Sequence, residues 1–381
     1  MEKGEPHLSR MSSPFPYLHM RPLSFALAVV TLVAACGDAA KKKPDSPAAG
    51  AAPASASTQS VDLTGAGASF PYPLYLKWFE AYAAKTGVKI NYQTIGSGGG
   101  IRQLSEMTVD FGATDAPMSD PELAKAKGGS ILHIPTALGA VVITYNLPEV
   151  AQPLKLTGEV VAAIFQGQIT RWNDARIAAL NAGAALPAKD ILVVHRSDGS
   201  GTTYVFTDFL AAVSPAWATK PGKGKEVQWP VGLGGRGNEG VAGQVKQLPG
   251  SIGYVELAYA KQNKLAYADI RNARGEYVTP TIGAVTAAAA GAAARLPTNT
   301  DYRVSIVNAS GKGVYPISSF TWLLVYRTQT DAAKGKKLID FVKWALTDGE
   351  KSAATLDYAP LPSAMAKQLI KQIGAVSVAA K

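Results

Sequence analysis

The stretch from Ile191 to Leu210, ILVVHRSDGSGTTYVFTDFL, constrains the fold more than any other part of the sequence. It opens with an apolar, β-branched run that is typical of a buried strand, and it closes with apolar side chains at helical spacing. The turn between them contains two glycines, at which the backbone can change direction sharply. The pattern therefore predicts a strand, a tight turn and a helix in immediate succession.

The side chains of this turn suit an anion. Arg196 offers a planar fork of donors that matches the oxygens of phosphate or carboxylate, and Asp198 is placed to hold that fork. Ser200 or Thr202 can cap the helix, whose first turn presents backbone N–H groups and the positive end of a dipole. A plain helix cap beside a local ion pair is the alternative. A serine nucleophile is less well supported, because Ser200 lacks the G-x-S-x-G elbow.

Length and composition favour a globular protein of one large domain or two smaller ones. The chain has 381 residues, of which 47% are hydrophobic, and this is ample for a sizeable core. The net charge of +10 could suggest nucleic acid, but apart from Lys41 to Lys43 the sequence has no long basic cluster interleaved with aromatic residues. We therefore expect no nucleic-acid partner.

The N-terminal segment has the features of a targeting signal rather than of a folded domain. An apolar run ends at Ala35 and is too short to span a bilayer, which indicates a signal peptide over residues 1–35. The run leads into Cys36, the only cysteine of the chain, in a pattern that resembles a bacterial lipobox. We expect Cys36 to be lipidated and to become the mature N-terminus. A spare or buried thiol after a signal that is cleaved elsewhere is the alternative.

The segment after Cys36 predicts a tether. Residues 36–60 are mostly Ala, Pro, Ser, Lys and Asp, a composition that cannot bury a core and is typical of disorder. Such a tether would lift a folded body from the membrane surface. We therefore expect the protein on the periplasmic or cell-surface side of a membrane, held by its lipid. A single cysteine allows no intramolecular disulfide, so stability there must come from packing.

Three further loops place short polar groups where a predicted strand gives way to a helix. Ser69 precedes an amphipathic helix over residues 74–84, and Ser97 lies just upstream of a predicted helix over residues 101–107. Asp115 follows a short apolar strand. Alternating strands and helices favour an α/β sheet, in which ligands bind at the carboxyl ends of the strands. For Ser69 a plain helix cap is the alternative.

The segment from Gly232 to Gly237, GLGGRG, matches the dinucleotide fingerprint G-x-G-x-x-G, and Glu256 follows at the end of a strand-like segment. However, Pro230 interrupts the segment that would have to be the first strand of a Rossmann unit. We therefore expect no nucleotide cofactor. No His/Asp spacing typical of a metal site is present either.

Seven segments, in order, resemble the periplasmic phosphate-binding protein family of the bacterial high-affinity phosphate ABC transporter, commonly called PstS. They span nearly all of Val61 to Ser363 and read GAGASFPYPLY, YQTIGSGGGIRQL, DFGATDAPMSD, HRSDGSGTTYVFTDFL, WPVGLGGRGNEGVAGQV, LPGSIGYVELAYAKQNKLAY and LDYAPLPS. In this interpretation GLGGRG is a turn of the family and not a nucleotide site.

The resemblance implies a type II periplasmic-binding-protein fold, in which two α/β lobes are joined by a two-strand hinge with the ligand cleft between them. Lobe one would hold residues 61–138 and 316–381, and lobe two residues 139–315. The long apolar segments 135–145 and 315–327 are the candidates for the crossings. The implied phosphate contacts, with Asp198 in a supporting role, are Ser69, Phe70 through its backbone N–H, Ser97, Asp115, Arg196, Ser200, Gly201 and Thr202.

The resemblance also implies a function: a lipoprotein, expected to be a monomer, that captures inorganic phosphate and delivers it to the permease subunits of an ABC transporter. No cofactor or metal is implied. We hypothesise that Asp115 selects phosphate, because an ionised carboxylate can only accept a hydrogen bond and sulfate at neutral pH has no proton to donate. A binding or sensor protein for another oxyanion remains an alternative. A phosphohydrolase is a weaker one, since the sequence shows no nucleophile with a base and no clustered metal ligands.

Overall fold

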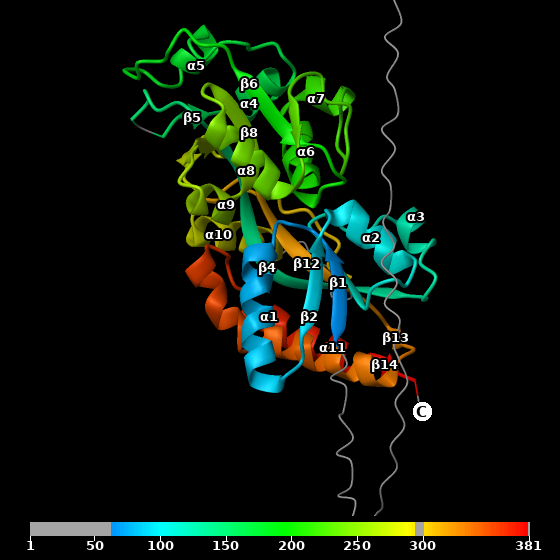
Figure 1. Cartoon of the computed structure of the whole chain (residues 1–381). Coiled ribbons are helices and arrows are strands. Elements are labelled where there is room, and N and C mark those ends of the chain that lie inside the picture. Colours follow the sequence, from blue (N-terminus) through cyan, green and yellow to red (C-terminus); the bar gives the residue numbers. More distant parts are fainter. Residues whose placement is uncertain (1–61, 152, 294–300, 380–381) are drawn as a thin grey trace, which may run out of the picture. The chain divides into compact units, whose positions relative to one another are not determined.

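The computed structural model of this chain describes residues 62–379 except 152 and 294–300 (Figure 1). The predicted signal peptide, the lipidation site Cys36 and the tether over residues 36–60 lie outside the described residues. None of the helices in the described part has the length and apolar composition needed to cross a bilayer.

A nine-stranded mixed sheet organises the described part of the chain. Its strands are β1 (Leu63–Gly67), β2 (Ile90–Thr94), β3 (Phe111–Thr114), β4 (Ile131–Tyr145), β6 (Leu192–Arg196), β7 (Leu233–Gly235), β8 (Ser251–Glu256), β9 (Ala266–Tyr267) and β12 (Ser318–Tyr326). They lie in the order β2-β1-β3-β12-β4-β8-β6-β7, and β9 pairs with β4 off this path. The pairs β1–β2, β1–β3, β6–β7 and β6–β8 are parallel, so the carboxyl ends of these strands point the same way within each half of the sheet.

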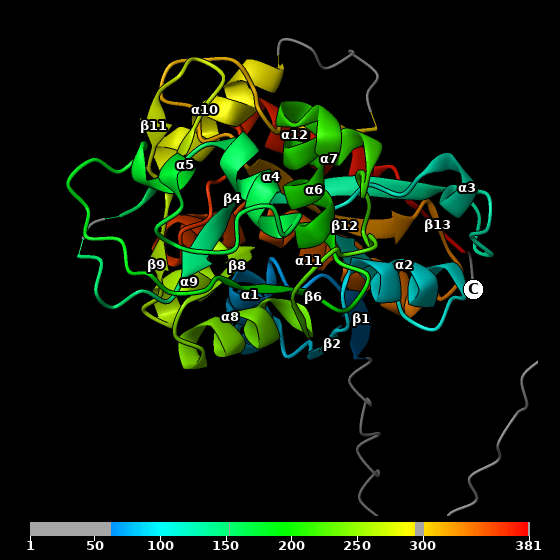
Figure 2. The ribbon, with the colours of Figure 1, turned by 90° about the horizontal axis from the view of Figure 1, so that it is seen from above.

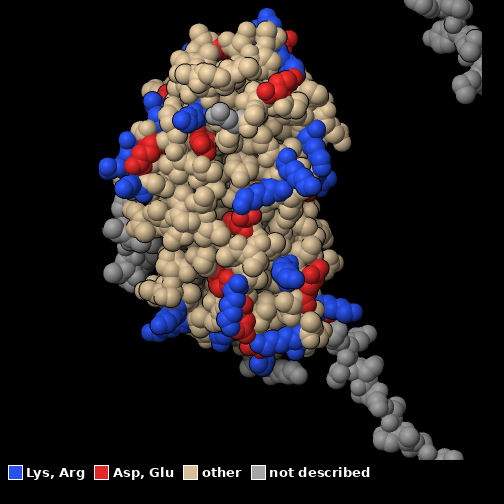
Figure 3. Space-filling view, turned by 90° about the vertical axis from the view of Figure 1, so that its left-hand side faces the viewer, with Lys and Arg blue, Asp and Glu red and all other residues tan. Residues whose placement is uncertain are grey.

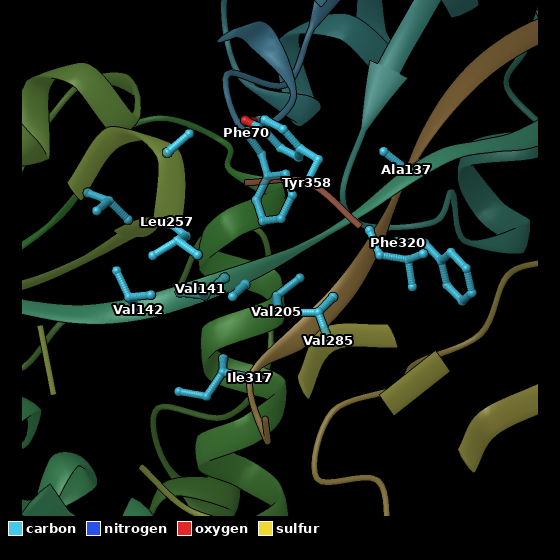
Figure 4. Close-up of a cluster of buried hydrophobic side chains, with 14 of the residues drawn as sticks. Phe70, Ala137, Val141, Val142, Val205, Leu257, Val285, Ile317, Phe320 and Tyr358 are labelled. Carbon is cyan, nitrogen blue, oxygen red and sulfur yellow. The ribbon is translucent and has the colours of Figure 1, made fainter. Parts of the chain in front are cut away.

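Two long antiparallel strands, β4 and β12, join the two halves of the sheet. Residues 131–140 of β4 pair with β12, and Val141 to Tyr145 pair with β8. Every residue of β12 is buried, and so is every residue of β4 after the first, which explains why both read as continuous apolar runs. Figure 4 shows the packing around these strands, with Leu257 near Val141 and Val142 of β4.

Helices cover the sheet. They are α1 (Tyr72–Thr86), α2 (Ser97–Ser105), α3 (Asp120–Leu123), α4 (Gly158–Phe165), α5 (Ala175–Ala178), α6 (Gly201–Val213), α7 (Pro215–Thr219), α8 (Gly237–Gln247), α9 (Leu257–Gln262), α10 (Ile282–Ala293), α11 (Ala332–Ala345), the 3₁₀ helix η1 (Gly349–Leu356) and α12 (Ser363–Gly374). Helix α2 packs on β1 and β3, and α8 packs on β6 and β8. Helices α4, α6 and α7 lie side by side in the view from above (Figure 2).

Two small sheets complete the architecture. One contains β5 (Lys155–Leu156), β10 (Asp269–Arg271) and β11 (Tyr277–Val278), and the other contains β13 (Thr328–Gln329) and β14 (Ser377–Val378). On the face shown in Figure 3, acidic and basic side chains are interspersed over a mostly uncharged surface. The positive net charge is therefore not gathered into one patch on that face.

Two predicted helices have wrong boundaries. The helix predicted over residues 101–107 already begins at Ser97, so the glycine run lies inside α2 rather than in a loop. Gly100 explains this, because any Cβ there would collide with the backbone of β1. From the sequence alone a helix is also predicted over residues 171–180. The structure has only the single turn α5 there, since Asp174 caps it and Arg171 forms a β-bridge with Asp190.

Candidate anion-binding site

The N-termini of α2 and α6 face each other across one point of the structure. The backbone N–H of Gly98 donates to the carbonyl of Gly199 over 2.8 Å. A Cβ on Gly201 would lie 2.5 Å from both the Oδ2 atom of Asp115 and the Oγ atom of Ser97. Only glycine therefore fits at the start of α6. Because each helix N-terminus carries a partial positive charge and free N–H groups, their meeting point favours an anion.

Arg196 supplies the full positive charge of this point. Its side chain is buried at the end of β6, with 3% of the residue exposed. Asp198 holds the guanidinium through two hydrogen bonds, one of them from Nε to Oδ1 over 2.7 Å, and Thr202 accepts a weaker one from Nη1 over 3.4 Å. Burial alone would raise the pKa of Asp198, but the hydrogen bonds and charge of Arg196 outweigh it and lower that pKa. Arg196 and Asp198 therefore form a fixed ion pair in which both side chains are charged.

Four buried hydroxyl groups surround the same point. Each of them accepts a hydrogen bond from an N–H group of the protein: Ser69 from Asn238, Ser97 from the backbone of Asp115, Ser200 from the backbone of Thr203, and Thr202 from Asn238 and Arg196. All four residues are at most 1% exposed. A hydroxyl that accepts from the protein keeps its own hydrogen for another partner. The four hydroxyls are therefore donors to whatever lies between them.

Asp115 contributes the acceptor that this set of donors otherwise lacks. Its Oδ1 atom accepts from the Thr321 hydroxyl over 2.8 Å, whereas its buried Oδ2 atom has no hydrogen-bond partner in the described part of the chain. Burial raises the pKa of Asp115 to about 7, although the bond from Thr321 and the charge of Arg196 act against that rise. Near neutral pH, Asp115 can therefore either be ionised and accept a hydrogen bond from a ligand or be protonated and donate one.

Two tyrosines fix the loop between β1 and α1. The Tyr259 hydroxyl donates to the carbonyl of Ser69 over 2.7 Å, and the Tyr358 hydroxyl donates to the carbonyl of Phe70 over 2.6 Å. Both tyrosines come from distant parts of the chain, and the Phe70 ring packs near Tyr358 in the core (Figure 4). The carbonyls of Ser69 and Phe70 are thus engaged with the protein, which fixes the orientation of the peptide groups to which they belong.

A cavity of about 600 Å³ adjoins the site at Asp115. Two ion pairs beside it connect segments that are far apart in the sequence. Lys225 Nζ lies 2.6 Å from Glu122 Oε1, and Arg303 lies 2.6 Å from Asp120 Oδ1. Within the described residues, no three His, Cys, Asp or Glu side chains gather closely enough to hold a metal ion.

The structure places the residues that the sequence singled out close together, linked in part by hydrogen bonds and in part by direct contact. Ser69 and Thr202 are linked through a shared partner, and Ser97, Asp115 and Gly201 lie in direct contact. The sequence interpretation missed Asn238 and Thr321. Asn238 directly follows the GLGGRG segment that was set aside as a turn, and its position at the start of a helix after a strand was the available signal.

An α/β sheet with a buried set of donors between two helix N-termini defines a solute-binding protein of the periplasmic-binding-protein class. In agreement, the profile of a family described as "PBP superfamily domain" matches residues 49–348. Two individual proteins are similar to this chain in sequence over most of its length. The phosphate-binding protein PstS of Xylella fastidiosa is 48% identical over 318 residues, covering 83% of this chain and 86% of the relative. PstS of Pasteurella multocida is 46% identical over 316 residues, covering 83% and 90%. The chain therefore belongs to the PstS family of phosphate-binding proteins.

A solved structure shares the fold. It is a high-affinity periplasmic phosphate-binding protein, PfluDING, bound with phosphate, and it matches with a TM-score of 0.64 at 22% identity. The match covers 81% of this chain and 93% of that one. The predicted fold class, an α/β periplasmic-binding-protein fold, is thereby confirmed.

Proposed function

We propose that this protein captures inorganic phosphate with high affinity and delivers it to the transmembrane permease subunits of a phosphate ABC transporter. Its family supports this function, because the relatives are named phosphate-binding proteins. One observation carries the proposal: the unpaired Oδ2 atom of Asp115 is the acceptor among a cluster of donors. Phosphate at neutral pH offers several oxygens that accept and one proton that can be donated, so it matches both parts of the cluster.

The predicted contacts divide into three roles. Arg196, held by Asp198, supplies the positive charge. Asp115 accepts a hydrogen bond from the protonated oxygen of phosphate. The remaining contacts donate hydrogen bonds to the phosphate oxygens, and they are the hydroxyls of Ser69, Ser97, Ser200 and Thr202 together with backbone N–H groups at Phe70 and Gly201. Charge-assisted bonds of this kind are short and strong, and they replace the water that phosphate loses on binding.

We further propose that β4 and β12 form the hinge between two lobes, with residues 61–138 and 316–381 in one and 139–315 in the other. The switch of β4 from β12 to β8 near Val141 supports this division. Under this proposal, the loops of Ser69, Ser97 and Asp115 belong to one lobe and the loop of Arg196 to the other. Opening at the hinge would separate them and release the ligand.

The location of the protein is also part of the proposal. A lipid on Cys36 would hold it on the periplasmic or cell-surface side of a membrane, with residues 36–60 as the tether, and it would act as a monomer. The lipobox-like sequence supports the anchor.

Isothermal titration of the full-length protein, stripped of bound ligand, tests the proposal with phosphate and then with sulfate at about pH 9, where Asp115 is ionised and phosphate still carries one proton. Tight one-to-one phosphate binding with little response to sulfate is the expected result. Tight binding of sulfate would keep the fold but refute the selectivity, and binding of neither would favour a sensor of another oxyanion. We propose that the protein is not a hydrolase, and incubation with a chromogenic phosphate ester checks this.

A further inference from the structure

Asn238 lies at the centre of the site without having been predicted there. It is fully buried in the first turn of α8. Its backbone N–H and its side-chain Nδ2 both donate to the Oγ atom of Ser69 over 3.0 Å. The same Nδ2 also donates to the Oγ1 atom of Thr202 over 3.0 Å. One amide group thus contacts hydroxyls from the β1–α1 loop and from the start of α6.

The orientation of this amide is fixed by its other end. The Oδ1 atom of Asn238 accepts from the backbone N–H of Glu256 over 2.9 Å. A backbone N–H can only donate, so the oxygen of the amide must face Glu256 and the nitrogen must face the two hydroxyls. The preceding residue, Gly237, has a φ of 70° and donates its N–H to Asp198 Oδ1 over 3.1 Å. The turn that presents Asn238 is therefore tied to the residue that holds Arg196.

The bonds from Asn238 determine which way the two hydroxyls point. A hydroxyl has one hydrogen and two lone pairs. On Ser69, both lone pairs face N–H groups of Asn238. On Thr202, the lone pairs face Nδ2 of Asn238 and Nη1 of Arg196. With their acceptor positions occupied, both hydroxyls have only their hydrogens to offer, and those hydrogens point away from the amide.

We propose that Asn238 is a positioning and specificity-determining residue of the oxyanion site, which occupies the lone pairs of Ser69 and Thr202 so that both hydroxyls donate to the ligand. The inference rests on the proposed function, since the ligand is taken to be phosphate. It adds that the site accepts only ligand groups that receive hydrogen bonds at these two positions. It also adds a link across the proposed cleft, because one side chain joins residues of both lobes.

A double-mutant cycle in the full-length protein tests this role, with phosphate titrated calorimetrically. Asn238→Ala should weaken phosphate binding by about 30-fold or more, because hydroxyls that turn away from the ligand forfeit charge-assisted bonds. In a Ser69→Ala, Thr202→Val background there are no such hydroxyls to orient, and the same change should weaken binding by less than about threefold. An equal loss in both backgrounds would mean that Asn238 merely supports the fold, and it would overturn the proposal.

Two further variants complete the test. Asn272 is another buried amide that donates to and accepts from its neighbours, but it lies with Glu276 and Val314, outside the site. Asn272→Ala should therefore leave the phosphate affinity unchanged. Asn238→Asp keeps the shape and the bond from Glu256 but presents an acceptor to both hydroxyls, so it should weaken binding by at least about tenfold more than Asn238→Ala.

If Asn238→Ala does not fold, an unchanged affinity of Asn238→Asp still refutes the proposal. The wild-type titration reports on the proposed function separately. A wild-type protein that binds no phosphate overturns both proposals, whereas normal wild-type binding with equal losses in both backgrounds overturns only the role of Asn238.

Discussion

Replacing Asp115 with Asn should turn sulfate into a ligand at alkaline pH. Sulfate has no proton at neutral pH, so the oxygen that faces Asp115 needs a donor. In the wild type, only the protonated carboxyl can provide one. With a pKa of about 7, the protonated fraction of Asp115 falls by about 100-fold between about pH 6 and about pH 9, which corresponds to about 2.7 kcal/mol. The sulfate affinity of the wild type should fall by the same factor over this range.

The structure predicts how the Asn side chain will lie. The Thr321 hydroxyl donates to Oδ1 of Asp115, so the carbonyl oxygen of Asn should take that position and its NH₂ group should take the position of Oδ2. This group donates at every pH. The sulfate affinity of Asp115→Asn should therefore be nearly constant with pH, and near pH 9 it should exceed that of the wild type by up to about 100-fold. Phosphate should bind more weakly, because its proton loses its acceptor.

The assay is calorimetric titration of both proteins with sulfate and phosphate at several pH values. Asp190→Asn is the matched control. It makes the same chemical change and removes the same charge, but at a side chain that is 82% exposed. This control should behave as the wild type. A wild-type sulfate affinity that does not change with pH, or a phosphate-to-sulfate ratio that is the same in Asp115→Asn, would refute the reasoning.

Three other predictions concern single side chains. Gly201→Ala should abolish measurable phosphate binding in titrations, because its Cβ would lie 2.5 Å from Asp115 Oδ2; a small effect would show that the loop can move aside. Asp198→Asn should weaken phosphate binding by about tenfold, since Arg196 loses an ionic partner; unchanged affinity would mean that Arg196 is held without it. Burial raises the pKa of Glu256 well above its usual value, so its contribution to stability is present at low pH and is lost as pH rises towards the native pKa. Above about pH 5, the free energy of unfolding of Glu256→Gln, measured with urea, should therefore rise relative to that of the wild type by up to about 1.4 kcal/mol per pH unit. If the free energies of unfolding of the two proteins change with pH in the same way, this reasoning is wrong.

The sequence was sufficient for those parts of the site that are local in the chain. The loop around Arg196 could be predicted because strand, turn glycines, cap and helix all lie within one short segment, and the structure has them in that order. The same holds for Ser69 and Asp115, each of which follows a short strand. In these places, local residue preferences and the final structure agree.

The parts that could not be predicted depend on contacts between distant segments. Asn238 bonds to Ser69 across 169 positions of the sequence, and Thr321 bonds to Asp115 across 206. No local pattern shows which residues meet over such separations. The start of α2 was misplaced for a similar reason: glycine normally weakens a helix, but Gly100 is needed there for close contact with β1. The raised pKa of Asp115 likewise follows from burial, which only the folded chain reveals.

The facing N-termini of α2 and α6 have a consequence for the proposed hinge. Two like ends of helix dipoles and the guanidinium of Arg196 repel one another when no anion lies between them, and an anion turns that repulsion into attraction. Under the proposed two-lobe hinge, closure would then be favoured only in the loaded protein. The outer surface of the two lobes would differ between the loaded and the empty protein, so the proposed permease could distinguish the two without touching the ligand, and an empty protein would not compete for it.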